Sequence, residues 1–191
     1  MDRIEEIVNQ INDRAEIAIV LGSGFGGALP ALRNVHEVTY TSVGIKYNHV
    51  EGHARKFVFG DFKDKRIVVF NRLHYYESGS LDNIRLLYKI IAKLGVKTIL
   101  MSTAVGAVNK ELKPTDLVLI HDHINLTGQN PLIGESPIRF IDLKNVYDAK
   151  LLNYAEEIGL KHNLNLKKGV HCQLTGPTYE TPSEIRMLRT L

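Results

Sequence analysis

Apolar residues recur at helical spacing in four stretches of the chain. The first stretch predicts an amphipathic helix near the amino terminus, with one apolar face made of Ile4, Ile7, Val8 and Ile11. The second predicts a helix capped by Ser80 and closed by Gly95, with a buried stripe of Ile84, Leu87, Ile91 and Leu94. The third covers 148–162, with Leu151, Leu152, Ala155 and Ile158 predicted to face inward. The fourth begins at Thr181, which has the spacing of a capping box with Glu184.

Short runs rich in β-branched residues predict strands between these helices. Residues 16–21 are apolar almost throughout, which is typical of a strand buried on both faces of a sheet. Further strands are predicted at 35–40, 56–62, 66–70, 96–102, 116–122 and 170–174. Strands alternating with helices, with hairpins in the middle, predict an α/β fold with a mixed central sheet flanked by helices. No repeat or linker divides the sequence, so we expect a single domain over 1–191.

Composition and charge exclude several classes of function. The chain is 44% hydrophobic and 24% charged, with a net charge of +3, and its Lys and Arg residues are spread along the sequence. No basic stripe interleaved with aromatics is present, so we expect no nucleic-acid partner. The one cysteine, Cys172, allows no internal disulfide. Neither a signal-peptide pattern nor a membrane-spanning apolar run is visible, and we therefore expect a cytoplasmic protein without a membrane partner.

A glycine cluster, LGSGFGG at 21–27, follows the first predicted strand. Glycines allow a tight turn that exposes successive N–H groups, and the Ser23 hydroxyl adds a donor, so the loop suits an anion. The cluster also satisfies G-x-G-x-x-G, which leaves a dinucleotide-binding domain as an alternative. Against that alternative, no acidic residue ends a second strand at the expected distance, and no Gly-Lys-Ser/Thr follows. A plain strand-to-helix turn is the other alternative.

A second polar cluster, NRLHYYE at 71–77, follows the predicted strand at 66–70. If that strand continues, Arg72, His74 and Tyr76 point to the same side because side chains alternate along a strand. The guanidinium of an arginine matches the geometry of phosphate, and a tyrosine hydroxyl can bind a sugar. The alternative is a sheet edge that simply faces water.

Three further segments carry candidate ligand-binding residues. His53 lies on a glycine turn, and the small residues at 101–107 follow a predicted strand and allow a ligand to approach the backbone. Tyr179 and Glu180 join a strand to a helix, where the ring can stack on a planar ligand and the carboxylate can accept a ring N–H. Histidine pairs occur in the sequence, but no carboxylate or cysteine set completes either pair, and we expect no metal.

Taken in order, the motifs LGSGFGG, EGHA, NRLHYYE, STAVGAVN, DHINLTGQNPLIG and GPTYET resemble those of the trimeric purine nucleoside phosphorylase and methylthioadenosine phosphorylase family. The resemblance covers essentially the whole chain. It implies phosphorolysis, in which a purine (deoxy)ribonucleoside and inorganic phosphate give the free base and (deoxy)ribose 1-phosphate. It also implies a homotrimer that needs no cofactor.

The resemblance assigns roles to individual residues. The phosphate-binding residues that it implies are Ser23, His53, Arg72, His74 and the backbone at Ala104. The nucleoside-binding residues that it implies are Tyr76, Tyr179, Glu180 and, in the pocket of the neighbouring subunit, Phe140. Among these, His74 and Glu180 are the expected catalytic residues. A carboxylate at Glu180 favours 6-oxopurines, because their N1–H can donate to it.

The sequence departs from the family pattern in three ways. STAVGA at 102–107 stands where the family usually has TNAAGG, and Tyr179 stands where it usually has phenylalanine. Family chains also continue beyond the last predicted helix with further phosphate-, ribose- and base-binding groups. We therefore expect a domain truncated on its C-terminal side, with impaired phosphorolysis. A non-catalytic phosphate-binding or oligomerising remnant of the same fold is the alternative.

Overall fold

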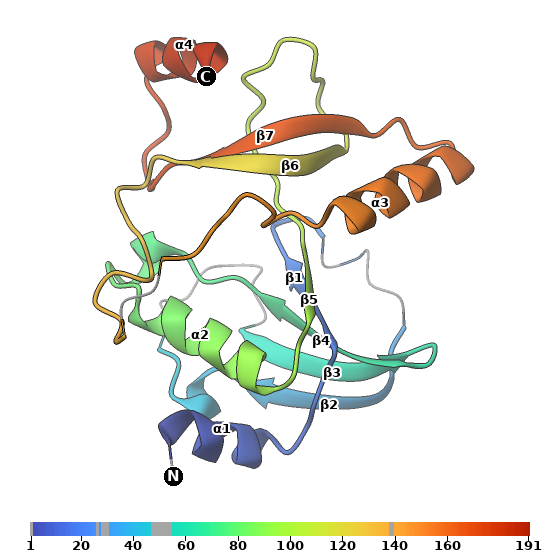
Figure 1. Cartoon of the computed structure of the whole chain (residues 1–191), viewed down its shortest axis with the longest axis vertical. Coiled ribbons are helices and arrows are strands. Elements are labelled where there is room, and N and C mark those ends of the chain that lie inside the picture. Colours follow the sequence, from blue (N-terminus) through green and yellow to red (C-terminus); the bar gives the residue numbers. More distant parts are fainter. Residues whose placement is uncertain (1, 26, 28–30, 47–54, 138–139) are drawn as a thin grey trace. The chain divides into compact units, whose positions relative to one another are not determined.

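The computed structural model describes residues 2–25, 27, 31–46, 55–137 and 140–191. The chain forms two units, Met1–Val105 and Gly106–Leu191 (Figure 1). The elements of the first unit are α1 (Arg3–Ile11), β1 (Ile17–Leu21), β2 (Arg33–Thr39), η2 (Thr41–Val43), β3 (Lys56–Phe62), β4 (Lys65–Asn71), η3 (Tyr75–Glu77), α2 (Asp82–Lys93) and β5 (Thr98–Met101). Those of the second are β6 (Val118–Asn125), α3 (Ala149–Lys161), β7 (Lys167–Gln173) and α4 (Pro182–Thr190). A single domain over 1–191 stays a prediction.

The first unit contains a mixed five-stranded sheet in the order β2-β3-β4-β1-β5. Strand β1 lies between β4 and β5 and runs parallel to both, whereas β3 pairs antiparallel with β4 and with β2. This confirms the predicted α/β fold with a mixed central sheet. The register pairs Leu21 with Asn71 and Val20 with Met101. The carboxyl ends of β4, β1 and β5 therefore meet at one edge of the sheet.

Helices α1 and α2 share one hydrophobic core with the sheet. From the helices come Val8, Ile11, Leu87, Ile90 and Ile91, and from the sheet Ala18, Val20, Phe57, Phe59, Val68 and Phe70. Both predicted apolar stripes are confirmed, and Gly95 ends the second helix with φ +93°. The predicted cap is one residue off: Leu81 is the N-cap of α2, and the Ser80 hydroxyl accepts the Asp82 N–H at 3.0 Å.

The second unit is much less buried. Its sheet has only two strands, β6 and β7, which run parallel. Among its described residues only Gly159 is buried. The prediction that the whole apolar stripe of α3 faces inward is wrong, because Leu151 and Ile158 are 43% and 39% exposed. A two-stranded sheet offers a helix too little surface to cover such a stripe. No helix in the described ranges is both long and apolar enough to cross a membrane.

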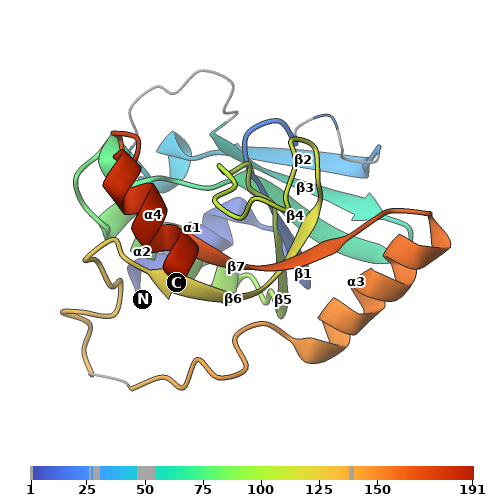
Figure 2. The ribbon, with the colours of Figure 1, turned by 90° about the horizontal axis from the view of Figure 1, so that it is seen from above.

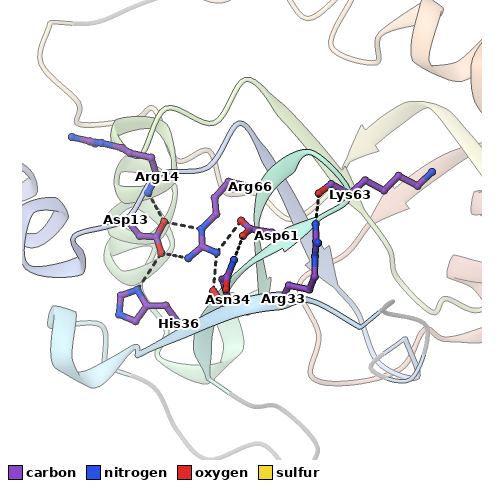
Figure 3. A network of polar contacts seen from close by, with 8 residues as sticks. All are labelled: Asp13, Arg14, Arg33, Asn34, His36, Asp61, Lys63 and Arg66. Atoms are coloured by element: carbon purple, nitrogen blue, oxygen red, sulfur yellow. Dashed lines mark hydrogen bonds and ion pairs between the residues drawn. The ribbon is translucent and has the colours of Figure 1, made fainter.

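An ion-pair network joins the strands at the other edge of the first sheet (Figure 3). Arg66, at the start of β4, contacts Asp13 at 2.6 Å and Asp61 at 3.1 Å, and donates to the Asn34 carbonyl at 2.8 Å. His36 of β2 contacts the same Asp13 carboxylate at 3.2 Å. Burial raises the pKa of Asp13, but hydrogen bonds from Arg66, the Arg14 N–H and His36 outweigh it and leave this pKa below its usual value.

We predict that Asp13→Asn lowers the free energy of unfolding by about 1.5–3 kcal/mol at neutral pH, the range for hydrogen bonds to a charged group. Because the folded-state pKa of Asp13 is lowered, its contribution is complete above the unfolded value near ~3.9 and is lost as pH falls through the lowered value. Urea unfolding of the unaltered chain and of Asp13→Asn, from neutral pH down through this pKa, measures the difference in the free energy of unfolding. Glu37→Gln, which removes an exposed partner of Lys56, is the control and should change little. An equal loss at every pH would contradict the account.

Candidate functional site

Hydrogen bonds tie together the carboxyl ends of the three parallel strands. The N–H of Gly22 donates to the Ser102 hydroxyl at 3.2 Å, and that hydroxyl donates to the Val20 carbonyl at 3.2 Å. On the other side of β1, the Asn71 amide donates to the Leu21 carbonyl at 3.3 Å. The glycine loop, the segment after β4 and the segment after β5 therefore all leave the sheet from linked positions. This edge is where ligands bind in open α/β sheets.

Gly22 is required by close approach of two backbones. A Cβ at this position would lie 2.5 Å from the Ser102 carbonyl oxygen and 2.7 Å from Thr103 Cα, which no side chain can occupy without moving the backbone. The turn continues through Ser23, which is exposed, and Gly24, which has φ +84°. The glycine loop therefore packs directly against Ser102 and Thr103 at Gly22, and its next residues, Ser23 and Gly24, face solvent.

Arg72, His74 and Tyr76 contact one another in sequence. The Nε–H of Arg72 donates to His74 Nε2 at 3.0 Å, and the rings of His74 and Tyr76 stack with centroids 4.9 Å apart at 13°. The premise that the strand continues is wrong, because β4 ends at Asn71 and the chain turns into η3. Leu73, buried in the core, anchors this turn from the opposite side. The predicted cluster forms, but through a turn instead of strand alternation.

Glu77 and Arg55 also belong to this cluster, although neither was assigned a role from the sequence. Glu77 Oε1 accepts the His74 N–H at 2.9 Å and lies 2.8 Å from His74 Nδ1, while Oε2 lies 2.8 Å from Arg55 Nη2. Both charged side chains are only 3% exposed. The contact of Glu77 with His74 has a signal in the sequence, because the carboxylate lies three residues after the histidine in a turn. Arg55 has no such signal, because its partners lie on a distant part of the sequence.

The protonation of His74 follows from its neighbours. Burial lowers the pKa of His74, and the charges of Arg72 and Arg55 act in the same direction, which together outweigh the raising effect of Glu77. His74 is therefore mainly neutral at neutral pH. Arginine Nε can only donate, so Nε2 of His74 is the acceptor and Nδ1 carries the proton toward Glu77.

The remaining predicted residues are less constrained. His53 lies outside the described residues. Ala104 is exposed and follows Ser102 and Thr103 in the segment after β5. In the second unit, Phe140 is 100% and Tyr179 95% exposed. Glu180 is half-buried. The pKa of the Cys172 thiol is raised first by burial of the thiol and then by the charge of Glu180. The roles of all these residues stay predictions.

No group of three or more His, Cys, Asp or Glu side chains that could hold a metal ion occurs in the part of the chain that the structure describes. The polar groups at the strand ends are instead hydroxyl, guanidinium, imidazole and backbone N–H groups. Such a set is suited to an anion with several oxygens.

Comparison with known proteins identifies relatives of this chain. The sequence pattern of the family described as "Phosphorylase superfamily" matches residues 16–191. Purine nucleoside phosphorylase 1 of Bacillus subtilis is 36% identical over 200 residues, which cover 100% of this chain and 74% of the relative. Purine nucleoside phosphorylase of Mus musculus is 32% identical, with coverage of 93% and 65%. The structure of Schistosoma mansoni purine nucleoside phosphorylase in complex with inosine superposes with a TM-score of 0.89 at 30% identity, covering 100% of this chain and 72% of that one.

The chain is shorter than these relatives. It spans 74% of the Bacillus protein, 72% of the Schistosoma chain and 65% of the mouse protein, so it corresponds to about two thirds to three quarters of their length.

We predict that Gly22→Ala lowers the free energy of unfolding by roughly 1–3 kcal/mol, the usual result of forcing a group into a filled space. The new methyl group would meet backbone atoms of Ser102 and Thr103, which cannot rotate away. Gly27→Ala is the matched control, because nothing lies within 4 Å of its added Cβ. Thermal unfolding of the unaltered chain, Gly22→Ala and Gly27→Ala measures the loss of stability. Equal stability of Gly22→Ala and Gly27→Ala would contradict the backbone contact at Gly22.

Proposed function

The chain belongs to the phosphorylase superfamily, and from this premise we propose that it carries the phosphate-binding and nucleoside-binding parts of a purine nucleoside phosphorylase. The reaction joins inorganic phosphate to C1′ of a purine (deoxy)ribonucleoside and releases the free base. Identities of 36% and 32% to two purine nucleoside phosphorylases support this assignment. So does the similarity to a structure of such an enzyme in complex with inosine.

The observation that carries the proposal is the contact of Arg72 with His74 beside the tied strand ends. The Nε–H of Arg72 is directed to His74, and we assign its two Nη groups to phosphate oxygens as a forked pair of donors. Ser23 would add its hydroxyl, Ala104 its backbone N–H, and His53 a ring donor. Each of these residues follows or precedes a strand of the same sheet.

The proposed chemistry needs no covalent bond to the protein. As the bond from C1′ to the purine nitrogen breaks, its electron pair leaves with the base and positive charge develops on the sugar. The phosphate oxygen then forms the new bond to C1′. Phosphate held beside the sugar stabilises this charge and is already oriented for attack. Glu180 would accept the N1–H of a 6-oxopurine, while Tyr76 would lie near the ribose and Tyr179 would stack near the base.

A homotrimer is part of the same proposal. Phe140 is 100% exposed, as expected of an aromatic residue that closes the ribose pocket of a neighbouring subunit. The proposed reaction uses inorganic phosphate as its only co-substrate, and no cofactor takes part.

We predict that calorimetric titration detects binding of inorganic phosphate and that Arg72→Met weakens it roughly ten- to a hundredfold, the equivalent of about 1.5–3 kcal/mol for a charge-assisted contact. Arg33→Met removes a guanidinium that donates to the Lys63 carbonyl at the other edge of the sheet, and is the matched control. Equal phosphate affinity in Arg72→Met and Arg33→Met would refute the assignment of Arg72.

We also predict little or no phosphorolysis of inosine by the 191-residue chain alone, because its relatives contain further sequence that it does not match. A group that stabilises charge only in the transition state contributes about 3 kcal/mol, so each one absent lowers turnover by two to three powers of ten. The complete Bacillus subtilis relative in the same assay is the control. Equal turnover numbers would contradict this expectation. Phosphate binding with no turnover, even after the unmatched C-terminal part of the relative is supplied as a separate fragment, would favour the non-catalytic phosphate-binding alternative.

A further inference from the structure

Arg55 is a buried cation whose polar partners lie in the segment proposed to hold phosphate. Its side chain is 3% exposed, and its Nη2 lies 2.8 Å from Glu77 Oε2. Its Nη1 donates to the backbone carbonyl of Arg72 at 3.1 Å. Arg55 thus links the start of β3 to both ends of the 72–77 turn.

The backbone at Arg55 has an unusual conformation that its surroundings hold in place. Its φ of +46° lies in the left-handed region, which a residue with a long side chain rarely adopts. Its carbonyl accepts the N–H of Tyr40 at 3.0 Å, which holds the peptide in place. Strained backbone of this kind persists where the surroundings over-determine it, and it clusters at functional sites.

The groups that face His74 come from three parts of the chain. Arg55 precedes β3, Arg72 follows β4, and Tyr76 and Glu77 belong to η3. Of these, Arg72 donates to Nε2, Glu77 lies at Nδ1, and Tyr76 stacks on the ring. Arg55 acts through Glu77, because it occupies the carboxylate oxygen that His74 does not contact.

We propose that Arg55 is a positioning residue that, by neutralising Glu77, holds His74 as the neutral Nδ1–H tautomer and sets the pH at which His74 becomes a donor toward phosphate. With Arg55 present, the Glu77 carboxylate already has a counter-charge and does not need a proton on His74. Without it, the negative charge of Glu77 favours the imidazolium. In the neutral tautomer, Nε2 presents a lone pair, so His74 can donate to an anion from that nitrogen only after it is protonated.

The tautomer is measured on the unaltered chain. Nitrogen-15 NMR of the histidine rings at neutral pH is expected to show His74 with a proton on Nδ1 and none on Nε2. A proton on Nε2, in the other tautomer or in the imidazolium, would overturn the inference. This readout does not depend on phosphate binding or on any substitution.

A titration of His74 by NMR then tests the role of Arg55. Arg55→Met is expected to raise the pKa of His74 by at least about one unit, a tenfold change in its protonation equilibrium. Arg55→Lys keeps a cation beside Glu77 and should restore most of the original value. Lys56→Met is the matched control, since it removes the adjacent cation, which pairs at 2.7 Å with Glu37 on the exposed part of the sheet.

An unchanged His74 titration in Arg55→Met, or a shift as large in Lys56→Met, would overturn the inference. Should Arg55→Met fail to fold, Arg55→Gln keeps a polar side chain there and carries the same expectation of a raised pKa, with the same contradicting result. The tautomer of His74 in the unaltered chain tests the inference independently of both variants.

The link to phosphate rests on the proposed function and is tested separately. Titration of inorganic phosphate across the pH range should show an affinity profile that moves to higher pH in Arg55→Met, together with the His74 titration. Comparison between variants removes the ionisation of phosphate itself. If His74 shifts but the phosphate profile does not, the role of Arg55 toward phosphate is overturned. If the unaltered chain binds no phosphate, the proposed function fails, while the tautomer and the His74 titration still test Arg55.

Discussion

The site depends on the parallel pairing of β1 with β4 and β5. Strands β2, β3 and β4 lie side by side in the same sheet (Figure 2). Because β4, β1 and β5 point the same way, the glycine loop, the 72–77 turn and the segment after β5 leave the sheet at one edge. Gly22 fits against the backbone of Ser102 only because it lacks a side chain, and the Ser102 hydroxyl bridges Gly22 and Val20. A single antiparallel strand in this group would send one segment to the opposite edge.

The buried carboxylate of Glu77 contacts both a cation and a histidine. Glu77 lies between Arg55 and His74, so one anion orients an imidazole and compensates a guanidinium. Buried charges are tolerated when they are paired and hydrogen-bonded, and here both oxygens of Glu77 are engaged. The Nε–H of Arg72 donates to His74, and in the proposed function the rest of its guanidinium binds the anion. In the proposed function, Arg55 and Glu77 therefore position the site, and Arg72 binds the ligand.

The sequence predicted the elements of this fold well, because periodicity reports burial directly. The strand at 16–21 and the helix with Leu87 and Ile91 follow from apolar patterns, and both are confirmed. The turn after Asn71 was not predicted, although the spacing of Glu77 three residues after His74 is a local signal for it. The buried pairing of Arg55 is a tertiary contact without a local pattern. The exposure of Leu151 shows the converse limit: an amphipathic stripe predicts a face suited to burial but does not specify what covers it.

In the proposed function, the carboxyl ends of β4, β1 and β5 form the phosphate site. A crystal structure of the chain soaked in inorganic phosphate tests it most directly. The account predicts a tetrahedral anion between the Arg72 guanidinium and the backbone of the loop at Ser23, with His74 still in contact with Glu77. Ordered Arg72 and His74 side chains turned away from Ser23, with no anion between them at saturating phosphate, would contradict it.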